Sequence, residues 1–74
     1  MDHAQVLTEL ADEIKQIIEY HYELIRRARG GMESGRYTNE ERYRQVKLYG
    51  KYAILIYSDA LKEIDLMLEY LKKV

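Results

Sequence analysis

Apolar residues recur every three or four positions along the first part of the chain, which is the spacing of one face of an α-helix. The repeat continues without a break through Leu7, Leu10, Ile14, Ile17, His21, Leu24, Ala28 and Gly31. A second set lies beside this seam and widens it: Ala11, Ile18, Ile25 and Met32. The pattern predicts a long amphipathic helix whose apolar stripe has the width found in packed bundles.

The second part of the chain shows the same regularity. Its seam contains Tyr43, Val46, Gly50, Ala53, Tyr57, Ala60, Ile64, Met67, Leu71 and Val74, flanked by Ile54, Leu61 and Leu68. Residues 52–57 are apolar on every side, so this segment predicts neighbours in more than one direction. A buried strand would give the same short run, but the heptad continues on both sides of it and favours a helix.

The end of the first helix has two interpretations. The chain contains no proline, which leaves glycine as the helix-breaking residue. Gly30 and Gly31 could stop the helix after Arg29. However, the stripe continues to Met32, and Gly35 is well placed as a left-handed residue that closes a helix. We therefore expect a helix over residues 3–34, with a break at Gly30 as the alternative.

A short turn at residues 35–37 is expected to join the helices. Thr38 is suited to cap the second helix, because Glu41 three residues later completes a capping box. The second helix is then predicted over 38–73. The helices would be about 46 and 54 Å long at 1.5 Å per residue, and such matched lengths suit an antiparallel hairpin.

The fold class predicted for residues 1–74 is a single all-α domain, an antiparallel two-helix hairpin that dimerises into a four-helix bundle. Self-association is expected because a domain of 74 residues rarely gains more than about 3–5 kcal/mol from its own core, and this one has no cysteine for disulfides. The residues predicted to form the dimer core are Leu7, Leu10, Ile14, Ile17, His21, Leu24, Ala53, Ile54, Tyr57, Leu61, Ile64 and Leu68.

Charge is segregated along the chain, although the formal total is only −1. Residues 1–25 carry a net charge of −5 and residues 26–51 a net charge of +5. The hairpin would therefore have an acidic terminal end and a basic loop end. Head-to-tail association places unlike ends together, so the charges favour an antiparallel dimer.

Arginine alternates with tyrosine at the basic end, a combination that can neutralise phosphates and stack on unpaired bases. The possible nucleic-acid contacts are Arg26, Arg29, Arg36, Tyr37, Arg42 and Arg44. A sequence pI of about 6.1 and the ordinary role of basic residues at a helix C-terminus argue for the simpler interpretation of a solvated or partner-paired surface.

The sequence gives little support for catalysis or for a cofactor. His21 lies on the seam, but the Glu-x-x-His pattern of bundle metal sites is missing because residue 18 is isoleucine. No histidine lies near Ser34 or Ser58 to activate a nucleophile. We expect no enzyme, no metal and no cofactor. His21 is interpreted as a structural residue, and if it faced its symmetry mate the dimer would respond to pH between about 5 and 8.

The segment Ser34-Gly35-Arg36-Tyr37-Thr38-Asn39-Glu40-Glu41, set between two heptad helices, resembles the turn of small ROP-like helical hairpins that dimerise into four-helix bundles. It is also similar to small adaptor proteins of archaeal spindle-shaped viruses. One asparagine, three glutamines and no cysteine are compatible with a thermophilic source. The resemblance implies a homodimeric adaptor.

The expected function is accordingly a non-catalytic homodimeric adaptor or protein-interaction module with an unidentified protein partner. The alternative is a nucleic-acid-binding regulator that uses the basic loop end. The longest uncharged run, residues 52–58, is too short to span a bilayer, and no secretion signal opens the chain. We therefore expect no membrane association and a cytoplasmic location, in the host cell if the protein is viral.

Overall fold

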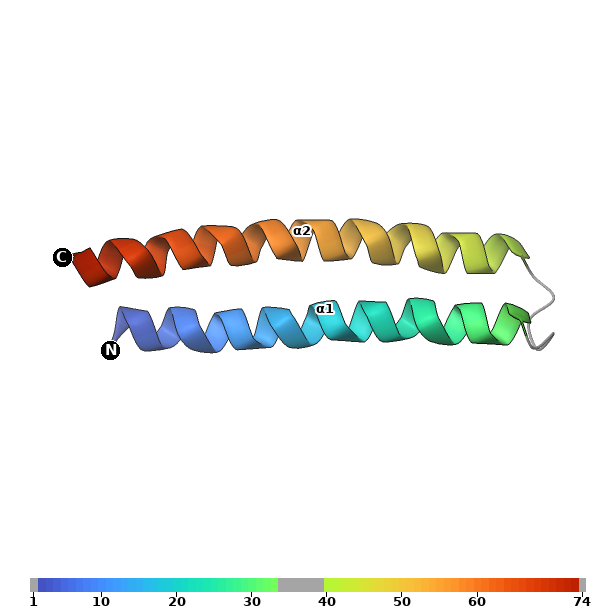
Figure 1. The fold of residues 1–74 in the computed structure, drawn as a ribbon, viewed down its shortest axis with the longest axis horizontal. Coiled ribbons are helices and arrows are strands. Elements are labelled where there is room, and N and C mark those ends of the chain that lie inside the picture. The colour runs from blue at the N-terminus through green and yellow to red at the C-terminus, as the bar shows by residue number, and fades with distance from the viewer. Residues whose placement is uncertain (1, 34–39, 74) are drawn as a thin grey trace.

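The computed structural model describes residues 2–33 and 40–73, which form two helices, α1 (His3–Glu33) and α2 (Glu40–Lys73). Figure 1 shows them lying side by side and antiparallel, with both chain termini at the same end. The predicted helical hairpin is confirmed. α1 continues through Gly30 and Gly31 to Glu33, so it does not break at Gly30. The expected turn at 35–37 and the cap at Thr38 lie outside the described residues.

Asp2 begins α1 in a way that the apolar pattern did not indicate. Its side-chain Oδ1 accepts a hydrogen bond from the backbone N–H of Ala4 at 3.0 Å, and its carbonyl accepts one from Val6 at 3.1 Å. A carboxylate in this position satisfies an N–H group that has no partner inside the helix and interacts favourably with the helix dipole. Asp2 is therefore the N-cap of α1.

The contact between the helices follows a heptad seam that differs from the predicted one at every second position. Ala11 is only 6% exposed, whereas Leu10 is 43% exposed. The side chains of α1 that face α2 are Leu7, Ala11, Ile14, Ile18, His21, Ile25 and Ala28, and those of α2 that face α1 are Tyr43, Gly50, Ile54, Tyr57, Leu61, Ile64 and Leu68. Half of the predicted central stripe of α1 is thus on the seam. Its other members, Leu10, Ile17 and Leu24, lie beside the seam, and Ala11, Ile18 and Ile25 of the predicted flanking stripe take their places.

The buried core of this seam is small. Among the described residues, Ala11, Ile14 and Ile64 are the buried hydrophobic side chains, and no large side chain is fully buried. The molecule is a rod about 55 Å long and 15 Å across, in which each helix has one neighbour. Most apolar positions away from the seam consequently remain in contact with water.

Gly50 allows the helices to approach each other closely. A Cβ atom at this position would lie 2.8 Å from Cδ1 and 3.0 Å from Cγ1 of Ile25, whereas a Cβ at Gly30 would meet nothing within 4 Å. Ile25 therefore packs into the space that the missing side chain of Gly50 leaves.

We predict opposite effects when each of these glycines is replaced by leucine. Gly50→Leu lowers the free energy of unfolding by about 1–3 kcal/mol, because a large side chain overpacks the seam. Gly30→Leu raises it by about 0.5–1 kcal/mol, because leucine favours the helix and the site is open. Urea unfolding followed by circular dichroism, at equal protein concentrations, measures both. Equal stability of the two variants would show that Ile25 does not need the space at Gly50.

Candidate interaction faces

The seam divides the surface of the hairpin into two flanks of opposite character. The seam residues of each helix form two alternating sets; in α1 these are Ala11, Ile18 and Ile25, and Leu7, Ile14 and His21. The residues immediately before the first set lie on one side of the seam. The residues immediately after the second set lie on the opposite side. Because the helices are antiparallel, the "before" residues of α1 and α2 share one side of the hairpin. The "after" residues share the other.

The side formed by the "before" residues is apolar. We call it the apolar flank: Leu10, Ile17 and Leu24 of α1 with Ala53, Ala60 and Met67 of α2, bordered by Val6, Tyr20, Tyr49 and Ile56. Of these, the exposed large side chains are Val6, Leu10, Tyr20, Tyr49, Ile56 and Met67. An apolar band thus follows the rod on one side. Ala60 also packs against the buried core of the seam, whereas the exposed side chains of the band remain in contact with water.

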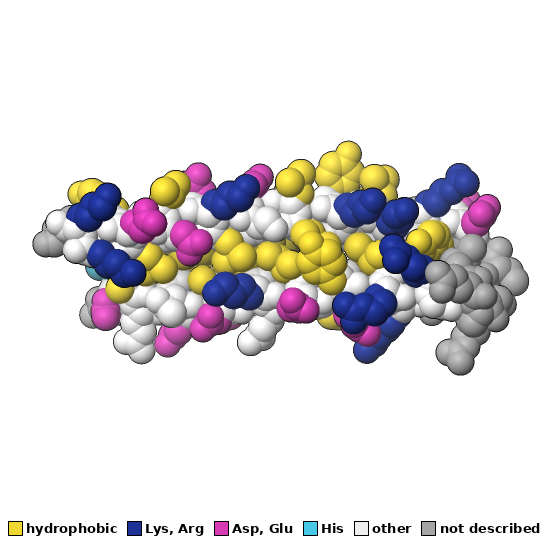
Figure 2. Space-filling model, in the orientation of Figure 1, with side chains coloured by type: hydrophobic (Ala, Val, Ile, Leu, Met, Phe, Trp, Pro, Cys, Tyr) yellow, Lys and Arg dark blue, Asp and Glu magenta, His cyan; other side chains and the backbone are white. Residues whose placement is uncertain are grey.

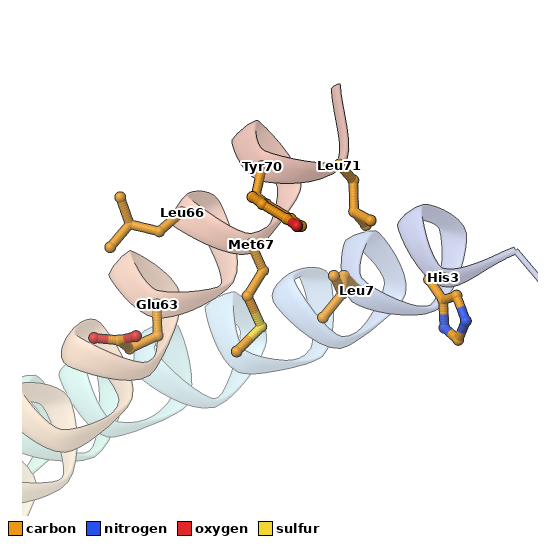
Figure 3. A pocket seen from close by; sticks show the side chains of 7 residues that line it. All are labelled: His3, Leu7, Glu63, Leu66, Met67, Tyr70 and Leu71. Atoms are coloured by element: carbon orange, nitrogen blue, oxygen red, sulfur yellow. The ribbon is translucent and has the colours of Figure 1, made fainter. Parts of the chain in front are cut away.

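A groove of about 420 Å³ lies at the terminal end of this flank. Figure 3 shows Met67 and Leu71 pointing from α2 toward Leu7 of α1, with His3 at the outer end. Side chains of both helices line the groove, which supports the geometric argument that their apolar sides open in the same direction. Its lining is almost entirely apolar, so it suits an apolar side chain better than a polar ligand.

The extra surface of the hairpin can be expressed as an area. A compact monomeric protein of 8.9 kDa exposes about 4,800 Å², whereas this chain exposes 6266 Å². The excess of about 1,500 Å² is larger than the roughly 800 Å² that each partner contributes to a standard protein interface. The rod as a whole therefore exposes more extra surface than one partner needs for a standard interface.

The residues that the sequence predicted for the dimer core fall into two groups in the structure. Those on the seam pack within the hairpin itself: Leu7, Ile14, His21, Ile54, Tyr57, Leu61, Ile64 and Leu68. Those on the apolar flank are Leu10, Ile17, Leu24 and Ala53. The predicted dimer core did not include Val6, Tyr20 and Ile56. Val6 lies four residues before Leu10, and Tyr20 lies three residues after Ile17, so the helical spacing indicated that both lie near the same stripe.

The opposite side is hydrophilic and mainly basic. We call it the polar flank: Thr8, Lys15, Tyr22, Arg29, Arg44, Lys51, Ser58, Asp65 and Lys72. Figure 2 shows a face on which Lys and Arg side chains of both helices gather, most densely toward the loop end, on either side of a band of hydrophobic side chains that follows the seam. The two flanks thus differ in the charged residues that they carry.

The structure describes four of the six residues predicted to contact nucleic acid, and these four do not all lie on one side of the hairpin. Arg29 and Arg44 share the polar flank, and Arg26 lies beside it. Arg42 lies on the other side of α2, next to the apolar flank. Arg36 and Tyr37 lie outside the described residues. Arg26 and Arg27 both form ion pairs with Glu23, and because these side chains are mostly exposed the pairs contribute little to stability.

His21 occupies the middle of the seam and is half-buried. Its ring stacks on Tyr57 of α2 with the centroids 6.5 Å apart and the planes inclined by 22°, and Tyr20 meets its edge at 5.6 Å. Within the described residues, no three His, Asp or Glu side chains are grouped to hold a metal ion. The arrangement therefore gives His21 a packing role between the two helices.

Neither α1 nor α2, over the part of the chain that the structure describes, contains a stretch long and apolar enough to cross a lipid bilayer. Comparison with models of protein families, with curated proteins and with solved structures gives no match to this chain. The function is consequently inferred from the two flanks and from the chemistry of the residues that form them.

Proposed function

We propose that this protein is a non-catalytic interaction module that acts as a homodimer, with two hairpins joined through their apolar flanks in a four-helix bundle. The observation that carries this proposal is the excess of about 1,500 Å² of exposed surface over a compact monomer. On this elongated surface, the apolar flank carries exposed apolar side chains of both helices. The assembly is the one expected from the resemblance to ROP-like hairpins, and it suits an adaptor, which needs surfaces rather than a reaction centre.

The apolar flank suits a second copy better than an unrelated surface because its two halves are complementary. Tyr20 borders the apolar flank near the middle of α1. Glu13 lies seven residues before Tyr20 and Arg27 seven residues after it. Steps of seven residues keep side chains on one side of a helix, so both border the apolar flank as Tyr20 does.

A head-to-tail two-fold axis at Tyr20 stacks α1 antiparallel on α1 of the partner subunit. Glu13 then faces Arg27 of the partner subunit, and the same contact occurs twice. With the loop ends together instead, α1 would stack on α2 and the two basic ends would meet. Charge therefore favours the head-to-tail arrangement, since electrostatic complementarity fixes the orientation of an interface.

We predict that Tyr20→Asp separates the subunits and that Tyr22→Asp does not. Both tyrosines are exposed, 59% and 49% respectively, and both are on α1, but Tyr20 borders the apolar flank and Tyr22 is on the polar flank. A charge forced into an apolar interface is costly. Light scattering should give twice 8.9 kDa for the wild type and for Tyr22→Asp, and a lower mass for Tyr20→Asp. A wild-type monomer at micromolar concentration would contradict the proposal.

Charge reversal tests the orientation. Glu13→Arg should raise the dimer dissociation constant roughly tenfold, since it places like charges together at two symmetric contacts worth up to about 1 kcal/mol each. The double variant Glu13→Arg/Arg27→Glu should recover most of this affinity. Asp12→Arg is the matched control, because Asp12 is an acid of α1 that projects away from both the seam and the apolar flank. If Glu13→Arg and Asp12→Arg have equal effects on sedimentation equilibrium, the head-to-tail orientation is wrong.

A second candidate function, nucleic-acid binding, is favoured by the alignment of Arg29, Arg44 and Lys51 on the polar flank. These residues stay exposed when the apolar flank is covered. Arginine and lysine neutralise phosphates, and binding of this kind weakens steeply with salt.

If the polar flank binds nucleic acid, Arg29→Glu/Arg44→Glu should weaken retention of single-stranded RNA at low salt. The slope of log affinity against log salt concentration should become shallower by about 0.7 for each phosphate that the variant no longer neutralises. Lys73→Glu, at the terminal end of α2, is the control and should have little effect. Titrations by fluorescence anisotropy over a range of salt concentrations measure both quantities. Salt-insensitive or undetectable binding by the wild type would exclude this function.

A further inference from the structure

The outer side of α2 carries apolar residues that neither the hairpin nor the proposed dimer covers. We call them the outer stripe: Leu48, Tyr52 and Leu55, which are 53%, 58% and 58% exposed. Their spacing of four and three residues places them on one side of the helix over two turns. Figure 2 shows hydrophobic side chains projecting along the outer edge of the molecule, at the level of α2.

The outer stripe lies on the side of α2 turned away from α1. At 100° per residue, Tyr52 is separated from the seam residue Tyr57 by more than a right angle. Around the helix axis, Tyr52 is also separated by about a right angle from Ala53 and Ala60 of the apolar flank. If the hairpins dimerise as proposed above, the outer stripe therefore remains in water. The inference rests on the proposed function in this respect.

One edge of the outer stripe is basic. Arg44 and Lys51 lie seven residues apart on the same side of α2, next to Leu48 and Leu55. Neither forms an ion pair with another described residue. Ser58 and then Asp65 follow Lys51 in the same row, while Lys62, seven residues after Leu55, has Asp59 at 3.9 Å. An apolar stripe with a parallel row of cations is complementary to an amphipathic helix that has acids beside its own apolar face.

We propose that the outer stripe is a docking site for an amphipathic helix of a partner protein. That helix presents apolar side chains at positions i, i+3 or i+4, and i+7, with glutamate or aspartate along the edge that meets Arg44 and Lys51. Tyr52 is central, and tyrosine is among the residues that most often dominate binding energy at interfaces. The homodimer would then present two such sites, as an adaptor requires.

Charge distinguishes this occupant from two others. If a second copy packed antiparallel on the stripe, the two basic edges would face each other. If the stripe lay on an anionic membrane, Asp59, which continues the same side of α2 one turn after Leu55, would be pressed against negative lipid. A partner helix with acids on one edge meets neither repulsion.

The test uses two labelled synthetic helical peptides that share leucines at i, i+4 and i+7 and differ only in having glutamate or lysine along both edges. In fluorescence anisotropy titrations, the glutamate peptide should bind the full-length wild-type protein saturably and at least tenfold more tightly than the lysine peptide. Tyr52→Asp and, separately, Leu55→Gln should each weaken it at least tenfold while circular dichroism shows unchanged helix content. Tyr22→Asp, the matched control, should bind as the wild type does. Arg44→Glu/Lys51→Glu should reverse the preference between the peptides.

The same titration in Tyr20→Asp separates this inference from the proposed dimer, because the stripe is present on each hairpin and binding should persist in the monomer. Equal binding of the two peptides, or no saturable binding, overturns the docking site even if the dimer is intact. Two further results would also overturn it. In one, the wild type does not bind the peptides but sediments with phosphatidylcholine–phosphatidylglycerol vesicles, and Tyr52→Asp does not. This result would assign the stripe to a membrane. The other is a lower solution mass for Tyr52→Asp than for the wild type, which would assign it to a second copy.

Discussion

The limited number of neighbours available to each helix determines the rest of this structure. A helix in a two-helix rod can bury one stripe of side chains, and the seam uses that capacity on residues such as Ala11, Ile14 and Ile64. Every other apolar position must be covered by another molecule or remain in water. Thirteen large hydrophobic side chains among the described residues are exposed, so the free energy of the isolated hairpin falls whenever part of this surface is removed from water.

The fold followed from the sequence because a period of three and four residues, unbroken over both halves and without proline, has few alternatives. The phase of the seam did not follow. Two adjacent stripes of α1 are both apolar, and a single-chain pattern cannot show which of them faces α2. Packing decides: Gly50 opposite Ile25 gives a large side chain a small partner, and Ala11 permits close contact near Ile64. Leu10 and Leu24, which are larger than Ala11, are left on the flank.

The sequence predicted how charge varies from one end of the hairpin to the other, but it did not predict on which side of the hairpin each residue lies. The net charges of residues 1–25 and 26–51 indicated unlike ends from the sequence alone. The division into polar and apolar flanks required the antiparallel pairing, because only that pairing brings Lys15 and Arg29 to the same side as Lys51. For the same reason Arg42 and Arg44, two residues apart and alike in the sequence, lie on opposite sides of α2. The sequence-based set of basic contacts therefore combined Arg42 with Arg29 and Arg44, which lie on the other side of the hairpin.

Self-association through the apolar flank leaves a specific part of α2 unexplained. Outward-facing positions of a four-helix bundle are ordinarily polar. Elsewhere on the outer side of α2, Lys62 and Glu69 are polar, whereas Leu66 is apolar, 59% exposed and part of the groove at the terminal end. Apolar side chains at Leu48, Tyr52 and Leu55 contribute nothing to the seam or to the apolar flank, while their exposure reduces solubility. Their grouping on two turns, beside Arg44 and Lys51, is the arrangement expected of a short second interface. The apolar surface of this hairpin thus includes a band along one flank of both helices and a short stripe on the outer side of α2.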